Sequence, residues 1–180
     1  MRRQRLAVFD LDHTLIRVDS FRTLLAKNLA NHPMVILDLI TRALGFCTRE
    51  VFAERVHRRL ELFLTNEEAV EKFVAHLALH VDHVVKNELE KRLSVDEQVI
   101  LLSASPNEYV QQFALQMGFA AGYGSGWRAG AYEHLYGDKK LEFVRKKFPQ
   151  DQYSWSFAIS DSASDFVFLS HFEEHVFWKP

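Results

Sequence analysis

The stretch that decides the fold is Leu6-Ala7-Val8-Phe9-Asp10-Leu11-Asp12-His13-Thr14-Leu15. Its first four residues are apolar and predict a short buried strand. The polarity changes at Asp10, where two carboxylates stand two positions apart. If the chain stays extended for one step, both face a common site at the strand end. Solvated turns also contain Asp-x-Asp by chance, so this pattern alone leaves both interpretations open.

Two carboxylates this close raise each other's pKa unless a cation lies between them. Mg²⁺ is a suitable cation because it prefers hard oxygen ligands and needs few carboxylates from the protein. A magnesium site at Asp10 and Asp12 is therefore one hypothesis for this strand end.

Two further apolar runs end in polar residues. Residues 99–102 lead into Ser103, and residues 155–159 are followed by Asp161 and, four positions later, Asp165. A hydroxyl and free amides at a helix start can hold a phosphate, although an ordinary helix cap has the same appearance. The two aspartates could complete a metal site with Asp10, or simply favour the first turn of a helix.

Lys139 and Lys140 open a predicted helix directly after Gly137-Asp138. A lysine supplies a point charge that can bind phosphate or balance a cluster of carboxylates. Taken alone, two adjacent lysines at a helix start more often lie on the surface.

The remaining pattern sets the order of elements. Asp19 or Ser20 could cap a helix, and apolar residues spaced three and four apart predict three or four helices between residues 34 and 93. Six of the seven glycines fall between Gly118 and Gly137, which predicts short strands and turns. The other expected elements are a strand at 99–102, helices at 106–117, 138–148 and 163–172, and strands at 155–159 and 175–178. Strands that alternate with helices predict an α/β fold, with a mostly parallel sheet covered by helices on both faces and its active site at the carboxyl ends of the strands.

Composition narrows the class of protein. The chain has 180 residues, 48% of them hydrophobic and 26% charged, which suits a globular protein. A net charge of -2 provides no global basic field for nucleic acid, and residues 34–46, the longest apolar stretch, contain Asp38 and Arg42 and cannot span a bilayer. The single cysteine, Cys47, excludes an intrachain disulfide. We therefore expect a cytoplasmic protein without a membrane or nucleic-acid partner; its oligomeric state is not predicted.

Taken in order, these motifs resemble those of haloacid dehalogenase (HAD) superfamily hydrolases. The four are Asp-x-Asp-x-Thr from Asp10, a strand ending at Ser103, the lysine Lys140, and Asp-x-x-x-Asp from Asp161 to Asp165. They look most like the phosphoserine-phosphatase-like subfamily, which has a helical cap. The resemblance implies a Rossmann-like catalytic core at residues 1–18 and 95–180, with an inserted all-helical cap at 19–94.

The resemblance also assigns roles to the aspartates. Asp10 would attack phosphorus and form an aspartyl-phosphate, and Asp12 would act as general acid and base. Mg²⁺ would be bound by the Asp10 side chain, the backbone carbonyl of Asp12 and the Asp161 side chain. The expected activity is hydrolysis of a phosphomonoester of a small metabolite.

By the same resemblance, Ser103 would bind a phosphoryl oxygen and Lys140 would neutralise charge on Asp10 and the phosphate. Asp165 would support the metal or the lysine. Lys140 is preferred over Lys139 because the lysine of the family usually precedes an aliphatic residue, here Leu141.

Four positions depart from phosphoserine phosphatases. Asp19, nine residues after Asp10, replaces a cap glutamate that helps to recognise the substrate, and it is a candidate for cap specificity. The glycine pair after the motif serine is Ala104-Ser105 here, and the glycine after the third-strand aspartate is Ser162. We therefore do not expect phosphoserine to be a good substrate.

Several alternatives stay open. A phosphotransferase or phosphomutase would use the same aspartyl-phosphate, and a non-catalytic binding protein could keep the fold. A dehalogenase is not favoured because those enzymes lack the second aspartate. His76, His80 and His83 share a helical face that could bind zinc, although exposed surface histidines are the more common explanation.

Overall fold

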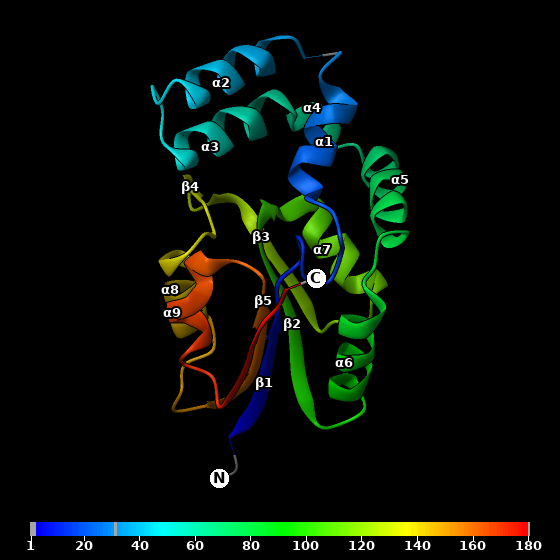
Figure 1. Cartoon of the computed structure of the whole chain (residues 1–180), viewed down its shortest axis with the longest axis vertical. Coiled ribbons are helices and arrows are strands. Elements are labelled where there is room, and N and C mark those ends of the chain that lie inside the picture. The colour runs from blue at the N-terminus through cyan, green and yellow to red at the C-terminus, as the bar shows by residue number, and fades with distance from the viewer. Residues whose placement is uncertain (1–2, 31, 180) are drawn as a thin grey trace.

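The computed structural model describes residues 3–30 and 32–179. Within this part of the chain, one six-stranded sheet has the order β4-β3-β2-β1-β5-β6 (Figure 1). Its strands are β1 (Gln4–Phe9), β2 (Glu97–Pro106), β3 (Ala121–Arg128), β4 (Ala131–Glu133), β5 (Tyr153–Ser160) and β6 (Glu174–Phe177). Only the β3–β4 pair is antiparallel among these strands. The predicted mostly parallel α/β sheet is confirmed.

Helices fill the connections between strands. They are α1 (Ser20–Asn28), α2 (Met34–Ala43), α3 (Arg49–Arg59), α4 (Glu61–Leu64), α5 (Glu67–Ala78), α6 (His83–Leu93), α7 (Asn107–Gln116), α8 (Asp138–Lys147) and α9 (Phe166–Leu169), with a 3₁₀ turn η1 (Ala163–Asp165) before α9. The block at 34–93 therefore holds five helices where three or four were expected, because α3 and α4 separate at Leu60.

The predicted last helix at 163–172 is also shorter than expected. Its first turn is a 3₁₀ turn, in which the Asp165 amide donates to the Ser162 carbonyl at 2.9 Å. After Leu169 the amides of His171 and Phe172 again bond three residues back, so the chain turns toward β6 instead of continuing the helix.

The central strand β1 is buried on both faces, which explains its uninterrupted apolar run. Leu6 and Val8 pack with α8 and α9 on one face, whereas Ala7 and Phe9 pack with α6 and α7 on the other. Figure 1 shows these two helical layers on either side of the sheet, with α2 and α3 above the carboxyl ends of the strands. The strand end that carries Asp10 therefore opens toward α2 and α3.

Two helices of the predicted cap pack against elements of the predicted core. Helix α5 packs against α7 and α6 against β2, and one apolar cluster joins Leu24 and Val56 to Phe9 of the sheet. The division into 1–18 and 95–180 against 19–94 stays a prediction, and residues 1, 2, 31 and 180 lie outside the described part. No helix in the described part is long and apolar enough to cross a membrane.

Asp82 ties the segment after β1 to the α5–α6 connection. Its side chain caps α6 by accepting from the Val84 amide at 2.9 Å, and it accepts from Arg17 Nε at 2.9 Å. Its own amide donates to the Leu15 carbonyl at 2.8 Å. Burial alone would raise the pKa of Asp82, but the hydrogen bonds from Arg17 and from the helix amides outweigh it and hold the pKa below its ordinary value.

Replacing Asp82 by alanine is expected to lower the free energy of unfolding by about 1–2 kcal/mol near pH 7. Because the folded-state pKa is depressed, this contribution is present above the unfolded-state pKa of about 3.9 and is lost as the pH falls through the folded value. Urea unfolding of wild type and Asp82→Ala should therefore converge below about pH 4.

Asn66→Ala is the matched control for Asp82→Ala. Asn66 caps α5 by accepting from the Ala69 amide at 3.0 Å, and it carries no charge. Its removal should cost the same stability at every pH. A constant difference between wild type and Asp82→Ala down to pH 3 would contradict the electrostatic account.

Candidate active site

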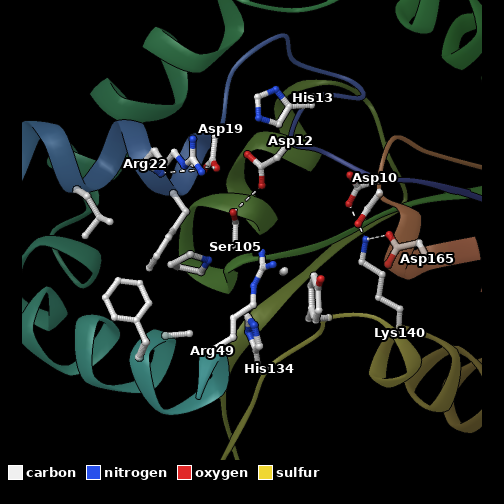
Figure 2. A pocket seen from close by; sticks show the side chains of 18 of the residues that line it. Asp10, Asp12, His13, Asp19, Arg22, Arg49, Ser105, His134, Lys140 and Asp165 are labelled. Atoms are coloured by element: carbon white, nitrogen blue, oxygen red, sulfur yellow. Dashed lines mark hydrogen bonds and ion pairs between the residues drawn. The ribbon is translucent and has the colours of Figure 1, made fainter. Parts of the chain in front are cut away.

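A cavity of about 410 Å³ lies at the carboxyl ends of β1, β2 and β5. Figure 2 shows its polar side chains converging from several elements. Asp10 and Asp12 come from the end of β1, Lys140 from α8, and Asp161 and Asp165 from the segment after β5. The structure thus brings five of the predicted site residues to one cavity.

Lys140 joins two of the strand ends. Its Nζ lies 2.7 Å from Asp10 Oδ1 and 2.6 Å from Asp165 Oδ2, and the residue is 3% exposed. Asp165 Oδ2 also accepts from Ser160 Oγ at 2.8 Å. The neighbouring Lys139 is exposed and pairs with Glu142 at 2.8 Å. Of the two lysines, Lys140 is therefore the one at the site.

Burial and the neighbouring charge of Asp165 raise the pKa of Asp10, the charge of Lys140 opposes them, and the net pKa is about 7. Burial alone would lower the pKa of Lys140, but Asp10 and Asp165 outweigh that effect and raise it, so the ammonium stays charged. This lysine balances only part of the negative charge that the aspartates bring to the cavity.

Asp12 is held by the start of α1 and the end of β2. Its Oδ1 accepts from the Ser20 amide at 2.5 Å, and its Oδ2 accepts from Ser105 Oγ at 2.7 Å and Ser103 Oγ at 3.3 Å. Burial raises the pKa of Asp12, and the hydrogen bonds from Ser20 and Ser105 oppose the rise. His13 follows with φ of 55°, a strained backbone turn for a residue other than glycine.

The serines at the end of β2 do not lie as expected, since Ser103 was predicted to bind a phosphoryl oxygen. Ser103 is fully buried and is not among the residues that line the cavity, whereas Ser105 is. Ser20 Oγ lies 3.0 Å from both Ser105 Oγ and Tyr109 Oη, which extends the hydroxyl network behind Asp12. Ser105 could have been found from the sequence, because positions two apart on a strand share a face. Phosphate binding by Ser103 stays a prediction.

Thr14 brings Asp10 and Asp161 together. Its Oγ1 lies 3.2 Å from Asp10 Oδ2 and 3.4 Å from Asp161 Oδ1, and it accepts from the Asp161 amide at 3.0 Å. Two carboxylates on either side of one hydroxyl present hard oxygen ligands close together, which fits a hard divalent cation. Asp10, Asp161 and the Asp12 carbonyl could supply its protein ligands.

A metal site built from three or more side chains would differ from the expected magnesium site, which uses two side chains and a backbone carbonyl. Among the residues that the structure describes, no three histidine, cysteine, aspartate or glutamate side chains are grouped to hold a metal. The expected magnesium ligands include only two side chains, so this finding does not bear on them. For the zinc alternative, the ring centroids of His76 and His80 lie 5.2 Å apart, and no third ligand is grouped beside them within residues 3–30 and 32–179.

Residues of the helical block close the cavity from the other side. Asp19 lines it, caps α1 by accepting from the Arg22 amide at 2.8 Å, and pairs with Arg22 Nε at 3.3 Å. Arg49 at the start of α3 stacks its guanidinium on Tyr136 at 3.9 Å. Sequence analysis did not single out Arg22, Arg49 or Tyr136, since nothing local distinguishes them from surface residues.

Comparisons with known proteins identify a matching family and several proteins with a similar fold. Residues 7–170 match the family model described as haloacid dehalogenase-like hydrolase. A *Bordetella pertussis* Tohama I protein of unknown function is 20% identical with a TM-score of 0.74, covering 97% of this chain and 89% of that one.

Phosphoserine phosphatases have a similar fold. One, solved as an analogue of its phospho-aspartyl intermediate, is 14% identical with a TM-score of 0.60, covering 99% and 95% of the two chains. Another, with substrate bound, is 15% identical with a TM-score of 0.61, covering 97% and 86%. No curated protein matches the chain.

Replacing Lys140 by methionine, which keeps the length of the side chain, leaves Asp10 and Asp165 buried without their shared cation. We expect a loss of about 3–5 kcal/mol in the free energy of unfolding, the usual result of removing one member of a buried ion pair. Lys139→Met is the matched control and should have little effect, because that ammonium is exposed. Equal losses in urea unfolding would contradict the described site.

Proposed function

Because this chain belongs to the haloacid dehalogenase-like hydrolase family, we propose that it is a Mg²⁺-dependent phosphomonoester hydrolase that acts through an aspartyl-phosphate on a small phosphorylated metabolite. The observation that supports this most is the buried contact of Lys140 Nζ with Asp10 at 2.7 Å, at the wall of a cavity that Asp12 and Asp161 also line. The contact orients a carboxylate and offsets part of its charge beside a space where a phosphate fits.

In the first half of the proposed reaction, a carboxylate oxygen of Asp10 forms a bond to phosphorus. The bond between phosphorus and the alcohol oxygen breaks, and Asp12 gives its proton to that oxygen. The contacts of Asp12 with Ser20, Ser105 and Ser103 fix its carboxyl group, so its orientation needs little adjustment during the reaction.

In the second half, a water oxygen bonds to phosphorus, the bond from phosphorus to Asp10 breaks, and Asp12 takes a proton from the water. The net reaction consumes one ester and one water and releases one alcohol and one phosphate. Both aspartates return to their starting states, so the cycle requires no oxidant and no co-reactant other than water.

Mg²⁺, when bound by Asp10, Asp161 and the Asp12 carbonyl, would offset the repulsion between the carboxylates and the anionic substrate. Lys140 contributes a fixed positive charge beside Asp10, and Asp165 holds that lysine in place at 2.6 Å. Ser103 and Ser105 are the hydroxyl candidates for a phosphoryl oxygen, with Ser105 already on the cavity wall.

Asp19 is proposed to contribute to substrate specificity, because it lines the cavity from the helical block. A cytoplasmic location stays an expectation from composition. Transfer of the phosphoryl group to an alcohol instead of water, as in a phosphotransferase or phosphomutase, is the alternative outcome of the test below.

Release of phosphate from p-nitrophenyl phosphate and a panel of metabolite phosphomonoesters tests this function. Wild type should need Mg²⁺ and lose activity with a chelator. Asp10→Asn, which keeps the shape but removes the nucleophile, should lower kcat roughly 10³-fold or more. Asp151→Asn changes an exposed aspartate away from the cavity and serves as the matched control.

Retention of wild-type activity by Asp10→Asn would contradict the proposed nucleophile. Release of the alcohol without phosphate, in the presence of an acceptor alcohol, would identify a phosphotransferase. A folded wild-type protein that binds Mg²⁺ but cleaves no ester would favour a non-catalytic binding protein.

A further inference from the structure

His134 stands in the cavity wall between β4 and α8. Figure 2 shows its imidazole beside the Arg49 side chain, across the pocket from Asp12 and Asp19. The ring also stacks on Tyr136, with centroids 5.8 Å apart and planes inclined by 13°. Its place opposite the catalytic aspartates is where the alcohol part of a bound ester would extend.

The contacts of Ser125 determine which nitrogen of His134 carries the hydrogen. Ser125 Oγ donates its one hydrogen to the Ala104 carbonyl at 2.7 Å and accepts from the Leu135 amide at 3.0 Å. Its contact with His134 Nδ1 at 3.1 Å therefore requires the imidazole to be the donor. In the neutral ring, Nε2 is then left as a hydrogen-bond acceptor.

That acceptor has no partner among the described residues, and the Nε2 atom is buried. Burial, together with the charges of Arg49 and Lys140, lowers the pKa of His134 to about 4, so the ring is neutral at neutral pH. A buried acceptor without a donor is unfavourable, and a ligand in the cavity that supplies the donor removes this cost once a small rotation of the ring exposes Nε2.

We infer that His134 Nε2 accepts a hydrogen bond from a hydroxyl group on the alcohol part of the substrate, so that the substrates are phosphorylated polyols. This inference rests on the proposed function and deepens it. A hydroxyl fits better than an ammonium group because the cationic side chains of Arg49 and Lys140 act on the same ring.

Two esters with the same carbon chain and charge test the inference: glycerol 3-phosphate carries hydroxyls and n-propyl phosphate lacks them. Each is added as a competitor during hydrolysis of p-nitrophenyl phosphate, and its inhibition constant is measured whether or not it is itself cleaved. For wild type we expect glycerol 3-phosphate to inhibit about tenfold more tightly, the value of one hydrogen bond of about 1.4 kcal/mol.

Two variants assign the preference to Nε2. In His134→Asn the side-chain amide can still donate to Ser125 but has no acceptor at the Nε2 position, so the ratio of the two inhibition constants should fall from about ten to about one. In His134→Gln the side-chain oxygen reaches the Nε2 position, and the preference should be retained. A purely structural role would change both constants alike and leave their ratio intact.

The outcomes distinguish a failure of the inference about His134 from a failure of the proposed function. A wild-type ratio near one, or a ratio that His134→Asn leaves unchanged, would overturn the assignment of His134. O-phosphoethanolamine that inhibits more tightly than glycerol 3-phosphate would overturn the choice of a hydroxyl. Absence of hydrolysis of p-nitrophenyl phosphate and of every metabolite ester in the panel by wild type with Mg²⁺ would instead overturn the proposed function, and the inference with it.

Discussion

The site depends on one buried cation shared by two carboxylates. Lys140 lies 2.7 Å from Asp10 at the end of β1 and 2.6 Å from Asp165 after β5, and it is 3% exposed. Burying an ammonium is costly unless it is paired, so this contact requires β1, α8 and the turn η1 to meet at one place. The same requirement explains the tight 3₁₀ winding at Asp165, which sets its carboxylate against both Lys140 and Ser160.

The helical block contacts the proposed general acid from the first residue of α1. The amide of Ser20 holds Asp12 at 2.5 Å, while Ser20 Oγ joins Ser105 and Tyr109 in a buried hydroxyl network. Movement of α1 would therefore alter the setting of the proposed general acid. Opposite this network, Arg49 and residues near β4 form the part of the cavity wall that we propose contacts the alcohol part of the substrate.

Sequence reasoning predicted the features that local pattern determines. Apolar runs located the strands, and the polar residues after them located the cavity. The choice of Lys140 over Lys139 came instead from the resemblance to the family, whose lysine usually precedes an aliphatic residue. Sequence reasoning missed the His134 acceptor, because that role depends on how the contacts of Ser125 direct the hydrogen of the imidazole. It also passed over Ser105, although its position two residues after Ser103 on the same strand could have indicated the shared face. It also placed too few helices at 34–93, since the break at Leu60 occurs inside a continuous helical periodicity.

The most direct test of the central claim is to trap the phosphorylated residue. The enzyme is quenched during turnover and treated with borohydride, which reduces an acyl phosphate to an alcohol and converts a phosphorylated aspartate to homoserine. Peptide mass spectrometry should find homoserine at position 10, and only when a phosphomonoester was present. Homoserine at another aspartate, or turnover without conversion at Asp10, would contradict the account.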